Sequence, residues 1–363
     1  TFTAVTVTRT IDSSASEVTI SFRNTGTTTN AAHVFYVDDI SVVPTGGTEC
    51  VGFATRASTS PDQIYAAVGR TVVLWNESTY AWDAVYIDAS AVVTAIIEFN
   101  NDISVAFGEA DGSTPHQYYY GSDTTWTVST ANATTTHQDN HARFFVKARD
   151  GYGQWALWKA GPSSNQGTEV NTIYSSQTPK TEWTPTSAFT VGSSSRAITG
   201  LHAIGDSFVI GKVDGLWYWD AMTVDFINVM PEWEHSVSTE NATIAEAWHG
   251  VLFFNTVRQG FLTYNPNGGT IQDLSKMLTT PRITDIGGRI TALASDTREL
   301  ILGLDQPVAD ATAAKTCRLV TMGANSAIHT IAERYMSIID AISKHEDTRM
   351  WVFGRAYDAS LDD

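Results

Sequence analysis

Residues Ile198–Asp220 read ITGLHAIGDSFVIGKVDGLWYWD, in which apolar and polar side chains alternate and two turn pairs, Gly205-Asp206 and Asp214-Gly215, interrupt the run. Period-two alternation bounded by turn residues predicts β-strands. The Asp214-Gly215 pair suits the positive φ angles of a type I′ turn, so we interpret it as hairpin geometry. The strands expected here are Ile198–Ile204, Ser207–Gly211 and Leu216–Asp220.

The same pattern recurs along the chain. Each copy joins an apolar strand, a polar turn and a second apolar strand that ends in Gly; the clearest copies are Val93–Gly108, Ile290–Gly303 and Ile338–Gly354. A degenerate copy ends in Asn255, and Asn is the non-Gly residue that best tolerates positive φ. A period of roughly 45 to 55 residues with several short strands per unit is typical of β-propeller blades.

The repeat therefore predicts an all-β fold, a β-propeller of about seven four-stranded blades over residues 50–363. An alternative is two stacked β-sandwiches, because the repeat is uneven over residues 137–195. The predicted blades are residues 50–92, 93–136, 142–192, 197–241, 242–288 and 289–333, with a partial seventh from 337.

Composition limits the function classes. The net charge is -17 and no run of Lys or Arg occurs, so a nucleic acid or an anionic membrane would be repelled. No apolar stretch is long enough for a transmembrane helix, and we expect no membrane insertion. Cys50 and Cys317 lie far apart and are interpreted as isolated thiols. The abrupt start in an alternating segment indicates a fragment of a longer protein.

Residues 1–44 form a separate unit, followed by a linker at 45–49. Three alternating runs, at Phe2–Thr8, Val18–Phe22 and Val34–Val42, predict the last strands of an incomplete β-sandwich. TFTAVTVT, VTISFRN and HVFYVDDISVV together resemble the end of a jelly-roll carbohydrate-binding module. The resemblance implies a structural calcium ion at Asp38 or Asp39, whose carboxylates suit a hard cation. Alternatively, one Asp faces solvent and the other orders a turn.

Few residues suggest a catalytic or metal-binding site. The segment THQDNH brings His137, Asp139 and His141 together as candidate metal ligands, or simply as solvated loop residues. Neither G-x-S-x-G nor H-E-x-x-H occurs and no carboxylate is singled out by a motif, so we expect no catalytic residue and, calcium apart, no cofactor.

Aromatic side chains are the best candidates for a ligand platform, because flat apolar rings can stack on sugars. We expect Tyr218, Trp155 and Trp158 to bind carbohydrate, whereas Trp217 and Trp219 share one strand face and are expected to pack between blades. The alternative for all of them is interblade packing.

The segment Ile198–Trp217, with its Gly-Lys-Val-Asp-Gly-Leu turn, resembles propeller repeats in large virion structural proteins of tailed bacteriophages. This resemblance implies a non-enzymatic structural or attachment protein, on a virion or outside the cell, that contacts other virion or surface proteins and glycans within a larger complex. Two alternatives are a secreted carbohydrate-binding or adhesion protein and a sialidase-like propeller glycoside hydrolase. GSDTTW at Gly121–Trp126 resembles a degraded Asp-box of the sialidases.

Overall fold

The protein is described from a computed structural model of residues 1–363. The residues that the structure describes are 49–57, 62–88, 91–107, 109–110, 114–115, 119–122, 125–128, 142–160, 171–180, 188–230, 237–256, 260–274, 289–305, 317–323, 328–334, 338–345 and 349–355. The chain divides into two compact units, Thr1–Thr48 and Glu49–Asp363. The first unit, and with it the predicted jelly-roll strands, lies outside the described residues.

All regular structure in the described part of the second unit is β-strand. Each four-stranded sheet is an antiparallel meander. Sheet 1 contains β1 (Cys50–Arg56), β2 (Gln63–Val68), β3 (Thr71–Asn76) and β4 (Ala81–Ile87). Sheet 2 contains β5 (Ala95–Phe99), β6 (Asp102–Ala106), β9 (Tyr119–Ser122) and β10 (Thr125–Val128). Sheet 3 contains β11 (Phe144–Arg149), β12 (Trp155–Ala160), β13 (Thr172–Ser176) and β14 (Ala188–Thr190).

The second half of the chain repeats the arrangement. Sheet 4 contains β15 (Ile198–Ile204), β16 (Ser207–Lys212), β17 (Gly215–Asp220) and β18 (Asp225–Met230). Sheet 5 contains β19 (Ala245–Trp248), β20 (Val251–Thr256), β21 (Gly260–Asn265) and β22 (Thr270–Asp273). Sheet 6 contains β23 (Ile290–Ser295), β24 (Glu299–Asp305), β25 (Cys317–Gly323) and β26 (Ile328–Arg334). Two-stranded sheets are formed by β27 (Ile338–His345) with β28 (Arg349–Arg355), and by β7 (Glu109–Ala110) with β8 (Thr114–Pro115).

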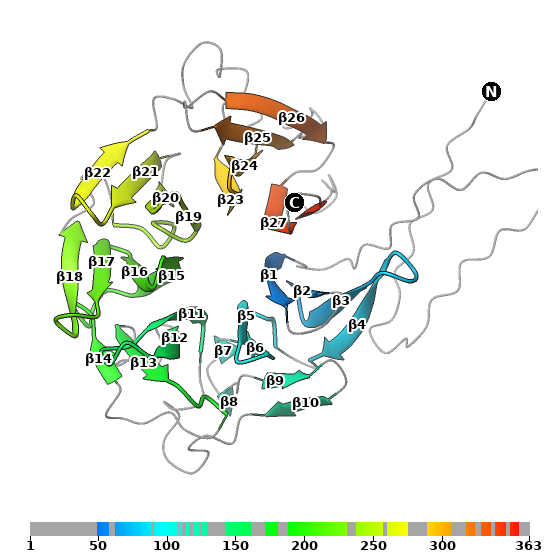
Figure 1. Ribbon diagram of the computed structural model, residues 1–363, viewed down its shortest axis with the longest axis horizontal. Helices are drawn as coiled ribbons and strands as arrows, with labels where there is room; N and C mark the ends of the chain where they lie inside the picture. Colours follow the sequence, from blue (N-terminus) through cyan, green and yellow to red (C-terminus); the bar gives the residue numbers. More distant parts are fainter. Residues whose placement is uncertain are drawn as a thin grey trace, which may run out of the picture. The chain divides into compact units, whose positions relative to one another are not determined.

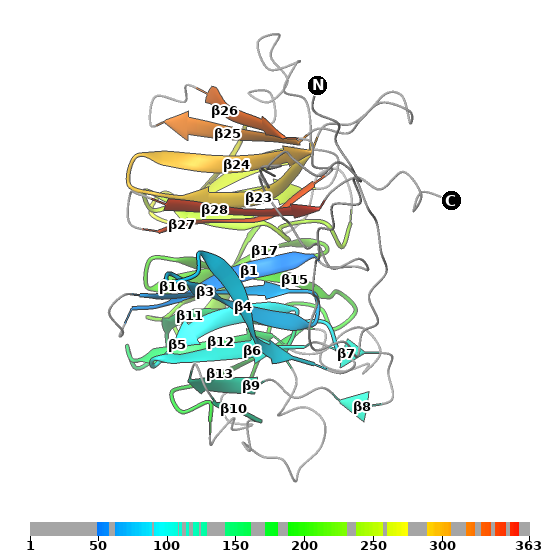
Figure 2. The same cartoon turned by 90° about the vertical axis from the view of Figure 1, so that its right-hand side faces the viewer.

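The four-stranded sheets follow one another around a ring (Figure 1). The first strand of each sheet contacts the first strand of the next, and β27 contacts both β23 and β1. Figure 2 accordingly places β27 and β28 between sheet 6 and sheet 1. This arrangement confirms the predicted all-β, propeller-like fold. A stack of sheets around an axis is stable because each sheet covers faces that a single sheet would leave exposed.

Aromatic side chains fill the junctions between sheets. Between sheets 3 and 4, Trp158, Phe208 and Trp219 are fully buried, and the rings of Trp158 and Trp219 lie 4.8 Å apart. The indole nitrogen of Trp219 donates to the Arg149 carbonyl at 2.9 Å. Trp219 is thus a packing residue, as its position in the strand predicts.

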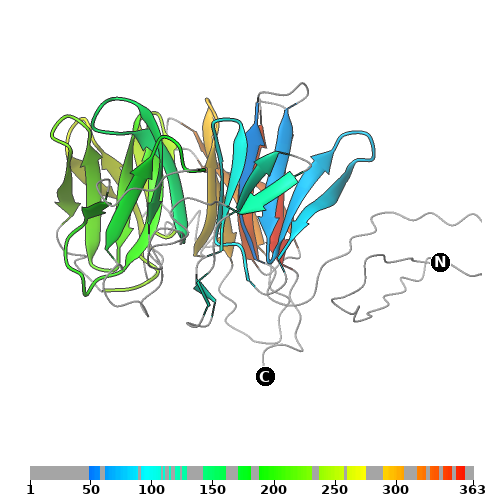
Figure 3. The same ribbon diagram turned by 90° about the horizontal axis from the view of Figure 1, so that it is seen from below.

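The strands run between two faces of the ring (Figure 3). In an antiparallel meander, the turns after the first and third strands lie at one edge, which we call the turn face. The starts of the first strands and the ends of the second strands lie at the opposite edge, which we call the entry face. Among the described residues, no helix is long and apolar enough to cross a membrane.

Two details of the repeat differ from expectation. Lys212 pairs with Gly215, so the turn residues are Val213 and Asp214, and neither Asp214 nor Gly215 has a positive φ. The type I′ prediction is therefore wrong. The loop is held instead by the neighbouring connection, since the Val213 carbonyl accepts hydrogen bonds from the amide of Ser238 and the side chain of Asn241.

The recurrent Gly at the end of the second strand serves close packing. A Cβ on Gly211 would lie 2.7 Å from the Cβ of Ala242, which leads into the next sheet, and a Cβ on Gly303 would lie 3.0 Å from Ile339. Asn255 also lacks a positive φ, so the conformational explanation of its substitution for Gly is wrong. Its side chain has a different role, described below.

Candidate functional site

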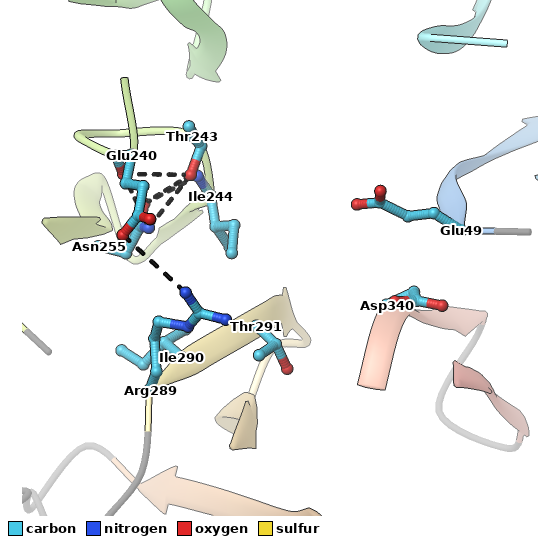
Figure 4. Close-up of a pocket in the computed structure, with 9 residues that line it drawn as sticks. All are labelled: Glu49, Glu240, Thr243, Ile244, Asn255, Arg289, Ile290, Thr291 and Asp340. Atoms are coloured by element: carbon cyan, nitrogen blue, oxygen red, sulfur yellow. Dashed lines mark hydrogen bonds and ion pairs between the residues drawn. The ribbon is translucent and has the colours of Figure 1, made fainter. Parts of the chain in front are cut away.

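A cavity of about 170 Å³ opens on the entry face, where the first strands of several sheets begin. Figure 4 shows Glu49 and Asp340 on one side of it and the Glu240–Arg289 pair on the other. Because the first strands line the axis of the ring, residues from sheets far apart in the sequence meet here. The lining residues are Glu49, Glu240, Thr243, Ile244, Asn255, Arg289, Ile290, Thr291 and Asp340.

Asn255 holds one wall of this cavity in place. Its side-chain oxygen accepts the amide of Ile244 at 2.9 Å, and its side-chain nitrogen donates to the Glu240 carbonyl at 3.1 Å. The Ala242 amide donates to the Asn255 carbonyl at 2.9 Å. A Gly could not make the side-chain bonds, so Asn255 ties the connection between sheets 4 and 5 to the end of β20.

The charges of the cavity are partly paired. The Arg289 guanidinium lies 3.9 Å from the Glu240 carboxylate, and both side chains are about half exposed, so the pair contributes little stability. Burial raises the pKa of the Cys50 thiol to about 12, and the charges of Asp340 and Glu49 add to this effect, which a hydrogen bond with the Gly52 backbone only partly offsets. Cys50 is therefore a protonated, buried thiol and no nucleophile.

No cluster of three or more metal-ligating side chains occurs among the described residues. Cys50 and Cys317 are both buried and neither forms a disulfide, as the sequence predicts. The side chains of the entry-face cavity also serve the connections between sheets, as those of Asn255 show.

Glu246 is a carboxyl group that no sequence motif indicates. It lies on β19, and the hydroxyl of Ser295 on β23 donates to it at 2.7 Å. Burial raises its pKa to about 7, which the hydrogen bond from Ser295 only partly offsets. A carboxyl group that keeps its proton near neutral pH is chemically able to act as a general acid.

Two further ionisable groups, the fully buried Lys212 and the partly buried His202, stabilise connections. The Lys212 ammonium donates to the carbonyls of Val191 at 2.6 Å and Ser193 at 3.0 Å, and burial lowers its pKa to about 8. His202 donates from Nε2 to the Ala242 carbonyl at 2.7 Å, and burial lowers its pKa to about 4. Both groups use backbone carbonyls, so they hold the chain between sheets.

A second cavity, of about 310 Å³, lies on the turn face between sheets 2 and 3. We call it the interblade groove. It is built by the β5–β6 turn and by the turn that follows β13, and the side chains of Asp102 and Lys180 form an ion pair across it. Its lining residues are Phe99, Asn100, Asp102, Ser104, Gln177, Thr178, Pro179 and Lys180.

The two walls of the groove are tied together. The Asn100 side chain donates to the Gln177 carbonyl at 3.4 Å, and the Gln177 side chain donates to the Asp150 carboxylate at 2.7 Å. Asn100 and Asn101 have φ angles of 53° and 67°, and the Asn101 amide donates to Glu98 at 2.8 Å. Asn tolerates this left-handed geometry better than most residues, which favours the tight turn.

The predicted carbohydrate-binding residues have different environments. Trp155 is 40% exposed on the turn face, so it remains available to a ligand. Trp158 is fully buried and donates to the Ala148 carbonyl, so the prediction that it stacks on sugar is wrong. Tyr218 is partly buried, with its ring 6.1 Å from that of Tyr264, on the strand face opposite Trp219.

The predicted metal ligands cannot be placed. Asp38 and Asp39, and the histidine group His137, Asp139 and His141, lie outside the described residues. Sequence reasoning missed the interblade groove and Glu246, because their partners come from different sheets and no local spacing signals them.

Comparison with known proteins shows similarity of fold. No protein-family model matches the chain, and no curated protein matches its sequence. Two solved structures of the extracellular domain of a candidate one component or hybrid two component system from B. thetaiotaomicron match at TM-scores of 0.55 and 0.58, with 12% and 13% identity. These matches cover 85% and 88% of this chain but only 37% and 38% of the other chains.

A chain in the crystal structure of the mitotic checkpoint complex also matches, with a TM-score of 0.56, 13% identity, and coverage of 91% of this chain and 100% of the other. Proteins of such different kinds share an architecture and little sequence, and a fold of this kind hosts many functions. The comparisons therefore support an all-β, propeller-like fold.

Proposed function

We propose that the chain is a non-enzymatic structural and attachment protein, in which the ring of sheets is a rigid scaffold that presents its turn face to partners. The observation that carries this proposal is the exposure of large apolar side chains on turns of that face. Tyr152, Met222 and Tyr80 are 90%, 94% and 74% exposed. Turns that a rigid scaffold positions commonly carry binding residues, so these three turns are candidate contact points.

The packing between sheets supports a scaffold role. Fully buried aromatic side chains join sheets 3 and 4, and Asn255, Lys212 and His202 hold the connections with hydrogen bonds to the backbone. Rigid elements position contacts more accurately than isolated loops do.

An extracellular location is part of the proposal. Two similar structures are extracellular domains, and this likeness favours a protein that acts outside the cell. The virion assignment rests on the resemblance of Ile198–Trp217 to phage virion repeats, and glycan contact by the N-terminal unit rests on the jelly-roll resemblance.

The full blade count also belongs to the proposal. The β27–β28 sheet occupies a position between sheet 6 and sheet 1, and each of the other positions holds a four-stranded sheet. We propose that β27 and β28 are the inner strands of a seventh blade. Hydrogen exchange of the β28 amides tests this: protection on both edges of the strand supports it, and rapid exchange along one edge contradicts it.

Location decides between the virion protein and its closest alternative. Mass spectrometry of particles purified from the source culture should find the chain at a fixed ratio to the other particle proteins. Recovery only as free protein in the medium would contradict the virion assignment and favour a secreted carbohydrate-binding or adhesion protein.

A glycoside hydrolase remains the second candidate, because the raised pKa of Glu246 suits a general acid. Incubation of the full chain with fluorescently labelled glycans should release no sugar. Turnover that Glu246→Gln abolishes would overturn the non-enzymatic proposal, whereas turnover that survives this change would indicate a contaminant or another site.

A further inference from the structure

We propose that the interblade groove and the neighbouring Trp155 form a binding site for a neutral oligosaccharide, with one sugar residue in the groove and the next against the Trp155 ring. This inference deepens the proposed attachment role, on which it rests, by naming a ligand class and a place on the turn face.

The polar lining suits a ligand rich in hydroxyl groups. Asn100 and Gln177 bring carboxamides, Asp102 a carboxylate, and Ser104 a hydroxyl group that is almost fully buried. A sugar hydroxyl both donates and accepts hydrogen bonds, and planar side chains with two polar atoms can bind two adjacent hydroxyls at once. A mixture of donors and acceptors converging on a concave site is typical of small-molecule recognition.

Charge argues for a neutral ligand. The Asp102 carboxylate is paired with the Lys180 ammonium, and beside the groove the Lys147 ammonium lies 3.0 Å from the Glu98 carboxylate. Each pair cancels its own charge in a chain whose net charge is -17. A phosphate or carboxylate ligand would find no unpaired cation among these residues, and a cationic ligand would have to displace a lysine.

Aromatic rings supply the apolar contacts. The buried Phe99 lines the groove, and the Lys147 ammonium lies 5.9 Å from the centre of its ring and 6.0 Å from the centre of the Trp155 ring. The interblade groove and the Trp155 ring therefore lie close together, on either side of the Lys147 ammonium. Arg149 lies 4.9 Å from the Trp155 ring centre, and its contact restricts the orientation of the ring.

Hydrogen bonds link the two halves of the site before any ligand binds. Asp150 accepts the Gln177 side chain at 2.7 Å and the amides of Tyr152 and Gln154, both at 2.9 Å, in the turn that leads into Trp155. The groove wall and the Trp155 turn are thus held by the same carboxylate. Preorganisation of this kind reduces the entropy that a ligand must lose on binding.

Saturation-transfer NMR with neutral disaccharides and trisaccharides, each at about 1 mM, tests the inference on the full chain. We expect at least one neutral glycan to bind. Trp155→Ala and Asp102→Asn should each weaken this binding about tenfold, and Trp155→Phe should restore most of it. Ile87→Ala, at an exposed apolar side chain at the end of β4 in sheet 1, is the control and should leave affinity unchanged.

Several results would overturn the inference. These are the absence of binding by any neutral glycan, equal loss of binding in the Ile87→Ala control, and preference for peptides in a parallel screen. The near-isosteric Asp102→Asn variant keeps the test valid if Trp155→Ala does not fold. A negative result here would leave the particle-location experiment unaffected, so failure of this site and failure of the attachment role are distinguishable.

Discussion

Two junctions are rich in tryptophan: the one between sheets 3 and 4, and the one between the β27–β28 sheet and sheet 1. They differ in how deeply the rings are buried and in whether the indole nitrogens have hydrogen-bond partners. At the first, Trp158 and Trp219 are fully buried and both indole nitrogens donate to carbonyls. At the second, Trp75, Trp82 and Trp351 cluster with ring centres 4.3 to 5.4 Å apart but stay only partly buried.

The polar atoms show the same contrast. The indole nitrogens of Trp75 and Trp351 are buried and have no hydrogen-bond acceptor among the described residues. A buried donor without a partner costs about 1–3 kcal/mol. Aromatic side chains alone therefore do not complete a junction, because the strands on both sides must also provide cover and acceptors.

The largest expected effect contrasts the two junctions directly. Trp219→Ala should destabilise the protein by about 3–5 kcal/mol, because it opens a cavity in a fully packed core and removes the bond to Arg149. Trp351→Ala should cost only about 1–2 kcal/mol, since its ring is already partly exposed. Urea unfolding of both variants measures the difference, and equal losses would contradict the comparison.

The next effect concerns a polar contact at another junction, between Glu246 on sheet 5 and Ser295 on sheet 6. The Glu246 pKa rises from 4.5 to about 7 on folding. Between these values the unfolded chain releases the proton and the folded chain keeps it, so stability present below pH 4.5 is lost as pH rises towards 7.

Glu246→Gln should remove this part of the pH dependence while keeping a partner for Ser295. Thermal unfolding of both proteins at pH 4.5, 6 and 7.5 tests it. Over this pH range the free energy of unfolding of the unsubstituted protein should fall by about 3 kcal/mol. Parallel pH profiles would show that Glu246 titrates normally.

The smallest effect tests close packing between sheets. Gly211→Ala should cost about 1–3 kcal/mol, because its Cβ would lie 2.7 Å from Ala242 and 2.9 Å from the Ala242 carbonyl oxygen. Gly268→Ala, whose Cβ would make only an ordinary contact at 3.5 Å, should be nearly neutral. Differential scanning calorimetry compares them; similar melting temperatures would refute the packing explanation.

The blade pattern was predictable because each blade is a local meander. Ile198–Asp220 shows its strands and turns directly in the alternation of side chains, and β15, β16 and β17 lie within one residue of the predicted bounds. The turn at Val213–Asp214 was misplaced because the hydrogen bonds that hold it come from Ser238 and Asn241, in the connection to the next sheet.

The candidate site was much less predictable. Trp155 could be proposed from its residue type, but Trp158, three residues later and equally aromatic, is fully buried. The interblade groove joins Asn100 and Asp102 to Gln177 and Lys180 across more than one blade, so no window of sequence contains it.

The sequence by itself determined that this protein is a repeat of short antiparallel strands, because period-two alternation and turn residues act over a few positions. Only the tertiary structure decided which aromatic side chains are buried, why Gly211 must be small, and which polar groups converge on the turn face. Those properties depend on the approach of one sheet to the next, and that approach is set by contacts between residues far apart in the chain.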